Sequence, residues 1–185
     1  MTTDLSVCSS GILQVGSGVD VRVVKLLANQ KPDFLIEGTF NVNGDPDPAI
    51  FRSDAASPVA GDWDGVELRG SSVSTITNAE FKHGTYGLDV RDAAQAALHG
   101  VTVNYNTTGL FIQGNGPPSA TAVNSSFVDN TTYGVQVQGI YGQPNPELTV
   151  TRSAISRRSA HSSSRNSPSP RRQTSRRPRG SPPTE

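Results

Sequence analysis

Two carboxylates and two arginines stand at matching places in successive segments of the chain. Glu67 and Asp89 occupy equivalent positions of a repeat, each is followed two positions later by Arg69 or Arg91, and Asp92 comes next. Carboxylate oxygens of this kind are suitable ligands for Ca²⁺, and two stacked carboxylates without partners would raise the pKa of one of them. Alternatively, each arginine neutralises its carboxylate on an exposed face, where such a pair contributes little. The sequence therefore predicts either a calcium site at Glu67, Asp89 and Asp92 or a row of ion pairs.

The positions equivalent to Glu67 and Asp89 in the next two units of the repeat form a second candidate site. These positions hold Phe111 and Gln136, and Phe111 is a conspicuously apolar residue for an outward position. An outward phenyl ring could stack on a sugar ring, or neighbouring loops could cover it. Asn115 and Tyr141 fall in two long loops of the repeat. We therefore predict a carbohydrate-binding surface at Phe111, Gln136, Asn115 and Tyr141.

Other residue types that often do chemistry give weaker patterns. His83, His99 and His161 share no spacing that indicates a metal site, and we expect His83 and His99 to be turn or surface residues. Cys8 is the single cysteine, which excludes an internal disulfide and a thiolate metal cluster. Apart from calcium at the carboxylates, the sequence predicts no cofactor.

These candidate residues are placed by a repeat. Four glycines at nearly even intervals each open a run in which apolar and polar residues alternate. The four runs are Gly65–Gly70, Gly87–Asp92, Gly109–Gly114 and Gly134–Gly139. An interval of about 22 to 25 residues, filled with strands too short to bury a face alone, is typical of a solenoid whose units stack on one another.

Alternation within each run predicts which side chains meet. Side chains of an extended strand point to opposite faces in turn, so one inward column should contain Val66, Leu88, Leu110 and Val135. A second apolar pair follows in each unit: Ile76 with Phe81, Leu98 with Val103, Val123 with Val128, and Val150 with Ile155. Parallel strands of neighbouring units lie about 4.8 Å apart, so equivalent residues should form ladders.

Corners and insertions follow the same repeat. Asn106, Asn124 and Asn130 each begin an Asn-x-Ser/Thr sequence, but asparagine and threonine are also ordinary corner residues of such a coil. The extra length of the later units falls at one corner, around residues 114–118 and 141–146. Insertions confined to one corner project from one side, where repeat proteins often bind their partners.

Residues 19–156 resemble the right-handed parallel β-helix proteins of the pectin-lyase-like superfamily, which are rich in glycine-apolar-x-apolar runs and Asn/Thr corners. The segments Glu37–Phe40, Ile50–Asp54 and Gly61–Val66 together resemble the opening of many bacterial surface and secreted members. The resemblance implies an all-β, right-handed parallel β-helix of five or six windings. Right-handedness is also expected because parallel crossovers are almost always right-handed. An extracellular or surface location is implied by the relatives alone, since residues 1–16 show no signal-peptide pattern.

The resemblance also bears on catalysis. Pectate lyases of this fold hold calcium with acidic residues on an outward strand face and use a nearby arginine as base, which Glu67, Asp89 and Arg91 resemble in part. Polygalacturonase-like members use paired aspartates, a Gly-His-Gly run and a basic Arg-x-Lys run. The nearest counterpart here is Lys82-His83-Gly84, and the chain has no Asp-Asp pair. The departures favour a module without catalytic activity.

Composition divides the chain into three parts. We expect an irregular segment at 1–17, a β-helix domain at 18–156 and a disordered tail at 157–185. The tail holds eight of the 16 basic residues and one of the 16 acidic residues, so the remaining body carries 8 basic and 15 acidic residues. With almost no aliphatic residues, the tail cannot bury enough surface to offset its ordering entropy. The tail could be a sequence that is not under selection at the end of a truncated repeat, a linker, or an arm that binds nucleic acid. The nucleic-acid arm is the least supported of these because the tail has no aromatic residues.

The function predicted from the sequence is a non-catalytic extracellular or surface β-helix module that could bind polysaccharide. One alternative is a fragment of a polysaccharide lyase or glycoside hydrolase of this fold, and another is a truncated product without activity. No stretch is long and apolar enough to span a membrane. The open edge after Ile155 could allow self-association, because an unpaired strand edge can pair with another chain.

Overall fold

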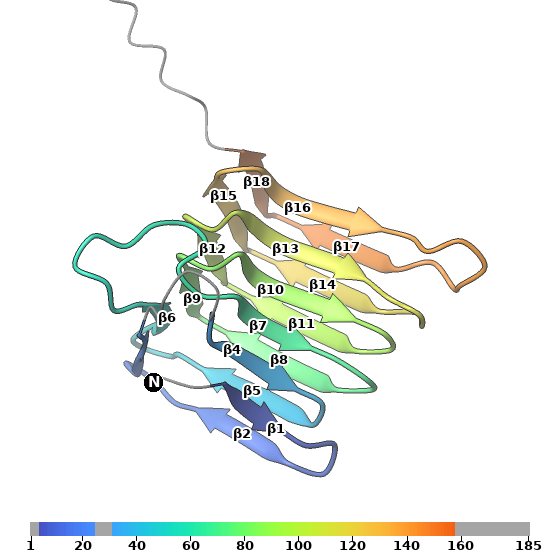
Figure 1. Cartoon of the computed structure of the whole chain (residues 1–185), viewed down its shortest axis with the longest axis horizontal. Helices are drawn as coiled ribbons and strands as arrows, with labels where there is room; N and C mark the ends of the chain where they lie inside the picture. Colours follow the sequence, from blue (N-terminus) through green and yellow to red (C-terminus); the bar gives the residue numbers. More distant parts are fainter. Residues whose placement is uncertain (1–3, 25–30, 158–185) are drawn as a thin grey trace, which may run out of the picture.

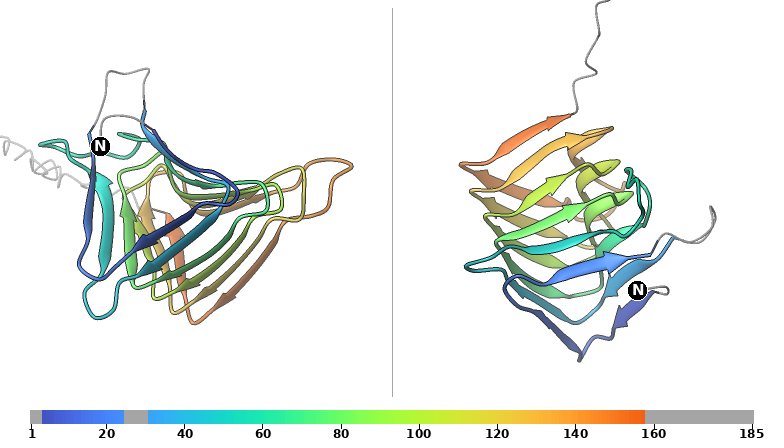
Figure 2. Two further views of the ribbon diagram at one scale, coloured as in Figure 1. Left: turned by 90° about the horizontal axis from the view of Figure 1, so that it is seen from below. Right: turned by 90° about the vertical axis from the view of Figure 1, so that its left-hand side faces the viewer.

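The computed structural model describes residues 4–24 and 31–157, which contain strands and turns but no helix. Eighteen strands of these residues form three parallel sheets of six strands each. The chain contributes one strand to each sheet per winding, so the described residues make six windings of a coil (Figure 1). Seen along the coil, the three sheets enclose a roughly triangular interior (Figure 2). The prediction of a parallel β-helix with five or six windings is confirmed.

The sheets are named here by their order along each winding. Sheet A consists of β1 (Leu5–Val7), β4 (Asp33–Ile36), β7 (Gly65–Leu68), β10 (Tyr86–Arg91), β13 (Thr108–Gln113) and β16 (Tyr133–Gln138). Sheet B consists of β2 (Ile12–Val15), β5 (Thr39–Asn43), β8 (Val73–Thr77), β11 (Gln95–His99), β14 (Ser119–Val123) and β17 (Glu147–Thr151). Sheet C consists of β3 (Asp20–Val23), β6 (Ala49–Ser53), β9 (Ala79–Lys82), β12 (Thr102–Asn104), β15 (Ser126–Asn130) and β18 (Ala154–Arg157).

The predicted inward column exists and forms part of one continuous core. Leu88 pairs in register with Val66 on one side and with Leu110 on the other, and Leu110 pairs with Val135. The first three side chains are fully buried, and Val135 is partly buried against the same core. Each winding thus buries its apolar residues against the windings above and below it, since no single winding could form a core.

Aromatic side chains fill the interior near the first windings. Phe51 stacks on Phe81 with ring centroids 4.7 Å apart, and Phe34 meets Phe51 and Trp63 edge to face. Trp63 is fully buried, and its indole N–H donates a hydrogen bond to the carbonyl oxygen of Lys82 at 3.0 Å. This arrangement satisfies the polar atom of the largest core residue.

Buried asparagines hold the corner between sheets C and A. Asn106 accepts a hydrogen bond from the Gly84 N–H at 2.8 Å, and its amide nitrogen donates to the Phe81 carbonyl at 3.0 Å. Its own backbone N–H donates to the side-chain oxygen of Asn130, one winding further on, at 3.0 Å. Both asparagines are fully buried, so at these two positions the prediction of corner residues is confirmed. Buried amides of this kind satisfy backbone groups that turn away from the sheets.

One opening glycine is required by the backbone. Gly65 has φ of 122°, a conformation that residues with a side chain rarely adopt. A Cβ atom at this position would also collide with the carbonyl oxygen of Tyr86 in the next winding. This close approach brings the start of β7 against the start of β10.

Two expectations from the sequence are corrected. Of the segment 1–17, residues 4–17 are described and are not irregular, because β1 and β2 pair in register with β4 and β5 and, with β3, make a first winding. In the fifth winding Ala122 pairs in register with Leu98 and is buried, as is Phe127, so these two residues and not Val123 and Val128 take the places of the second apolar pair. A slip of one residue exchanges the two faces of a strand, so the apolar character of the valines misled the assignment.

The long loops of the coil lie at two of its corners. Residues 114–118 and 139–146 both join sheet A to sheet B, so the predicted insertions share one corner (Figure 1). A further long connection, residues 54–64, joins β6 to β7 at the corner between sheets C and A. The predicted disordered tail lies outside the described residues, except that Arg157 ends β18.

Stacking of the windings predicts where truncation is most costly. Leu88→Ala, in the middle of the inward column, should lower the free energy of unfolding by about 3 kcal/mol because it leaves a cavity between two windings. Val137→Ala, in the last described winding, removes a side chain that is 46% exposed and should cost less than about 1 kcal/mol. Urea unfolding followed by circular dichroism measures both changes. Equal costs would contradict the stacking described above.

Candidate functional site

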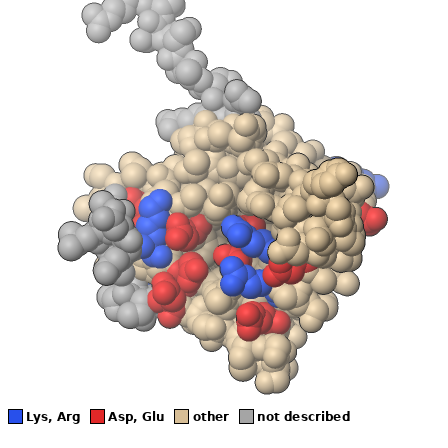
Figure 3. Space-filling view, turned by 45° about the vertical axis from the view of Figure 1, so that its right-hand side comes forward, with Lys and Arg blue, Asp and Glu red and all other residues tan. Residues whose placement is uncertain are grey.

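Charged and aromatic residues share the outward column of sheet A. Glu67 pairs in register with Asp89, Asp89 with Phe111, and Phe111 with Gln136. The outward column predicted from the sequence is therefore present, with neighbouring members about one strand spacing apart. Figure 3 shows acidic and basic side chains gathered side by side on one face of the coil.

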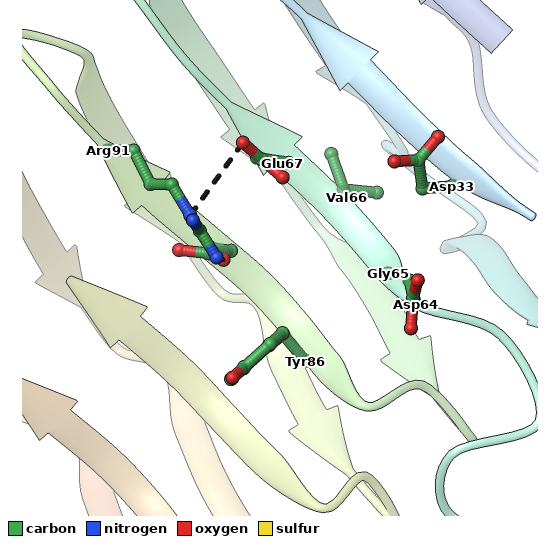
Figure 4. Close-up of a pocket in the computed structure, with 8 residues that line it drawn as sticks. Asp33, Asp64, Gly65, Val66, Glu67, Tyr86 and Arg91 are labelled. Atoms are coloured by element: carbon green, nitrogen blue, oxygen red, sulfur yellow. Dashed lines mark hydrogen bonds and ion pairs between the residues drawn. The ribbon is translucent and has the colours of Figure 1, made fainter. Parts of the chain in front are cut away.

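Arginines pair with both carboxylates of the column. Arg69 donates to Glu67 through its Nε at 2.7 Å, and Arg91 donates to one oxygen of Asp89 through Nε and Nη2 at 2.8 and 2.7 Å. Arg91 also lies 3.7 Å from Glu67, so its guanidinium connects the two strands (Figure 4). Charge-assisted hydrogen bonds of this kind fix the positions of the side chains that form them.

Asp89 is buried although it faces outward. Its side chain is 3% exposed, and its second carboxylate oxygen, Oδ1, has no hydrogen-bond partner among the described residues. Burial raises the pKa of Asp89 from 3.8 to about 6, against the opposing effect of the hydrogen bonds from Arg91. The same pairing raises the pKa of the Arg91 guanidinium. The ion pair therefore persists at neutral pH, and its carboxylate accepts a proton in mildly acidic solution.

A small pocket opens beside this pair. Its volume is about 140 Å³, and it is lined by Asp33, Asp64, Gly65, Val66, Glu67, Tyr86, Asp89 and Arg91. We call it the sheet A pocket. Asp33 comes from β4, Glu67 from β7, and Tyr86 and Arg91 from β10, so three successive windings form its walls (Figure 4). Asp64 immediately precedes β7, where the close approach at Gly65 places it beside the start of β10.

Of the three predicted calcium ligands, Glu67 and Asp89 line the sheet A pocket, whereas Asp92 does not. Asp92 lies at the corner after β10, where its carboxylate accepts a hydrogen bond from the Gly70 N–H at 3.2 Å. Glu67 and Asp89 are held by arginines, as described above. In residues 4–24 and 31–157, no group of three His, Cys, Asp or Glu side chains could hold a metal ion. Calcium binding thus remains a prediction from the sequence.

The exposed aromatic surface at this place belongs to Tyr86. The Phe111 side chain is 5% exposed, and its ring stacks against that of Tyr86 with centroids 5.2 Å apart and planes inclined by 14°. The outward phenyl ring therefore supports a partly exposed tyrosine that the sequence analysis did not single out. The available signal was the position of Tyr86 directly before the opening Gly87, one winding below Phe111.

The other predicted carbohydrate-binding residues lie further along the coil. Gln136 is partly exposed beside Phe111. Asn115 is exposed in the loop after β13, and Tyr141 is fully exposed in the loop after β16. The structure thus brings Gln136 next to Phe111 and places Asn115 and Tyr141 on the corner between sheets A and B.

A second hollow lies at the corner between sheets C and A. Its volume is about 500 Å³, and residues 58–60 together with His83, Tyr105 and Asp129 form much of its lining. His83 has φ of 71°, which agrees with its prediction as a turn residue. Burial, and then the neighbouring Lys82, lower the pKa of His83, so the imidazole is neutral at physiological pH.

Comparison with known protein families agrees with this geometry. A family described as the right-handed beta helix region matches residues 50–168, which is more than half of the chain. The chain belongs to the right-handed β-helix family. Searches of curated proteins and of solved structures gave no match. Within the described residues no helix could cross a lipid bilayer.

The raised pKa of Asp89 predicts a dependence of stability on pH. Between pH 4 and 6 the folded protein keeps a proton on Asp89 that the unfolded chain releases, so this residue's contribution to stability falls as the pH rises through about 6. The fall should amount to about 3 kcal/mol at most, since one pKa unit corresponds to about 1.4 kcal/mol. Asp89→Asn cannot titrate and should lack this fall.

The measurement is the free energy of unfolding of both proteins at pH 4, 5, 6 and 7. The wild type should lose stability relative to Asp89→Asn across this range. A relative gain with rising pH would show instead that attraction to Arg91 outweighs burial and holds the pKa of Asp89 below its ordinary value.

Proposed function

We propose that this right-handed β-helix domain is a non-catalytic carbohydrate-binding module that holds a polysaccharide against the outer face of sheet A. The observation that carries the proposal is the stacked pair of Tyr86 and Phe111 beside the sheet A pocket. Binding sites for small ligands combine apolar walls with a few placed polar groups. A pyranose needs both, because its ring has an apolar face and a rim of hydroxyl groups.

Preorganisation supports the proposal. The ring of Tyr86 rests on a buried ring, while Glu67 and Arg91 are held by ion pairs that span two strands. A ligand that contacts groups already fixed in place loses less side-chain entropy on binding. Carboxylates can accept hydrogen bonds from sugar hydroxyls, and the guanidinium can donate them.

A repeating polymer suits a repeating surface. The outward column continues from Glu67 through Asp89 and Phe111 to Gln136 along the coil. A polysaccharide that follows this column would pass the corner loops that carry Asn115 and Tyr141, which remain proposed contacts. An extracellular or cell-surface location is part of the proposal, and it rests on the resemblance to secreted and surface β-helix proteins.

The second candidate function is a polysaccharide lyase or glycoside hydrolase. The observation in its favour is a register pair of carboxylates, Glu67 and Asp89, in which burial raises the pKa of Asp89 to about 6. Two carboxyl groups in environments that separate their pKa values can act as acid and base. Release of new chain ends from a polysaccharide, abolished by Asp89→Asn, would support this candidate over the module.

The module predicts a loss of binding when the aromatic platform is removed. A glycan array first identifies a bound oligosaccharide, and calorimetry then compares the wild type with Tyr86→Ala and Tyr86→Phe. Tyr86→Ala should weaken binding about 10-fold, because it removes the exposed ring. Tyr86→Phe keeps the ring and should bind within about threefold of the wild type. Equal binding by Tyr86→Ala, or an array without any bound glycan, would refute the proposal.

A further inference from the structure

Acidic groups outnumber basic groups in the sheet A pocket. Four of its lining side chains are carboxylates, from Asp33, Asp64, Glu67 and Asp89, while Arg91 is the one lining cation. Glu67 and Asp89 are paired with arginines. Asp33 and Asp64 have no ion-pair partner among the described residues. Asp64 accepts a hydrogen bond from the Thr85 hydroxyl at 3.2 Å, and that hydroxyl accepts one from the Lys31 ammonium at 2.9 Å. Four carboxylates thus face three cations, Arg69, Arg91 and Lys31, so the pocket and its immediate surroundings keep an excess of negative charge.

The electrostatic environment of Asp33 reflects this excess. Burial raises the pKa of Asp33, and the nearby carboxylates of Asp4, Glu67 and Asp64 raise it further, against the smaller opposing effect of Arg69. Like charges that crowd a partly desolvated site disfavour ionisation. A cation in the pocket would relieve this repulsion, and so the pocket is better suited to a positive ligand than to a negative or neutral one.

The arrangement of the carboxylates indicates an organic cation. The four groups come from three successive windings, and the described residues contain no cluster that could coordinate a metal ion. Tyr86 adds an aromatic wall supported by Phe111. The face of an aromatic ring attracts an ammonium group, and it also packs against the apolar face of a sugar ring. A sugar ring that bears a protonated amine would therefore meet both the aromatic and the acidic parts of the pocket.

We infer that the sheet A pocket selects an amino sugar with a free, protonated amine, so that the ligand is a cationic polysaccharide built from units such as glucosamine. This inference rests on the proposed function, because it names the class of carbohydrate bound at the same site. The ammonium group lies against Asp33 and Asp64, and the sugar ring lies against Tyr86.

The test measures binding of three hexasaccharides to the full chain by calorimetry at pH 6, where the sugar amine is protonated. The probes are hexamers of glucosamine, N-acetylglucosamine and galacturonic acid. The glucosamine hexamer should bind at least 10-fold more tightly than either of the others, and its affinity should fall between 50 and 300 mM salt. Asp33→Asn and Asp64→Asn should each weaken its binding about 3- to 10-fold.

Glu147→Gln is the matched control, because it removes one negative charge from an exposed position on β17 of sheet B. It should leave glucosamine binding unchanged. Thermal unfolding checks that each variant is folded. If Asp33→Asn does not fold, the binding measured for Asp64→Asn alone tests the inference. Equal losses in Asp64→Asn and Glu147→Gln would overturn the inference, since they would indicate attraction to overall charge.

The remaining outcomes separate this inference from the proposed function. Equal or tighter binding of the acetylated or acidic hexamer, weakened by Tyr86→Ala, would overturn the cationic selectivity and leave the carbohydrate-binding module in place. Failure of all three hexamers, together with an empty glycan array, would overturn both.

Discussion

Every part of this structure depends on parallel strands of successive windings pairing in register. No winding can bury its apolar side chains alone, so Leu88 is buried only because Val66 and Leu110 lie directly below and above it. The same constraint orders the corners, where Asn106 and Asn130 hydrogen-bond from one winding to the next. A coil of this kind is stabilised by repetition, and its surface consequently consists of columns of equivalent side chains.

The outward column of sheet A shows what this repetition imposes on charged residues. Register places Glu67 beside Asp89, and a buried carboxylate at Asp89 is tolerated because Arg91 donates two hydrogen bonds to it. The ion pairs of Glu67 and Asp89 fix the side chains of this surface, and on the same surface the ring of Phe111 supports the ring of Tyr86. The proposed binding function uses this rigidity, and the proposed selectivity uses the acidic groups that the arginines do not neutralise.

The fold could be predicted from the sequence because each winding repeats the same pattern of residues at a nearly regular interval. Opening glycines and alternating runs predicted the inward and outward columns of sheet A. Prediction failed where the signal was short or ambiguous: β1 has only three residues, and Val123 is apolar although Ala122 points inward. The site was only partly predictable. The interval of the repeat predicts which residues share the outward column of sheet A. The burial of Asp89 depends on packing between windings, which no local sequence pattern reveals.

Residues far apart in the chain lie in one ladder that runs along the coil. Gln14 and Thr149 belong to the same outward column of sheet B and are separated by five register steps. At about 4.8 Å per step, the backbones should lie about 24 Å apart. Spin labels attached to cysteines at these two positions, in a Cys8→Ser background, report this distance by pulsed electron paramagnetic resonance. The stacked coil predicts a narrow distance distribution, centred near this backbone distance and widened by the length of the labels. A broad distribution, or a separation nearly twice as large, would contradict the stacked coil and the site built on it.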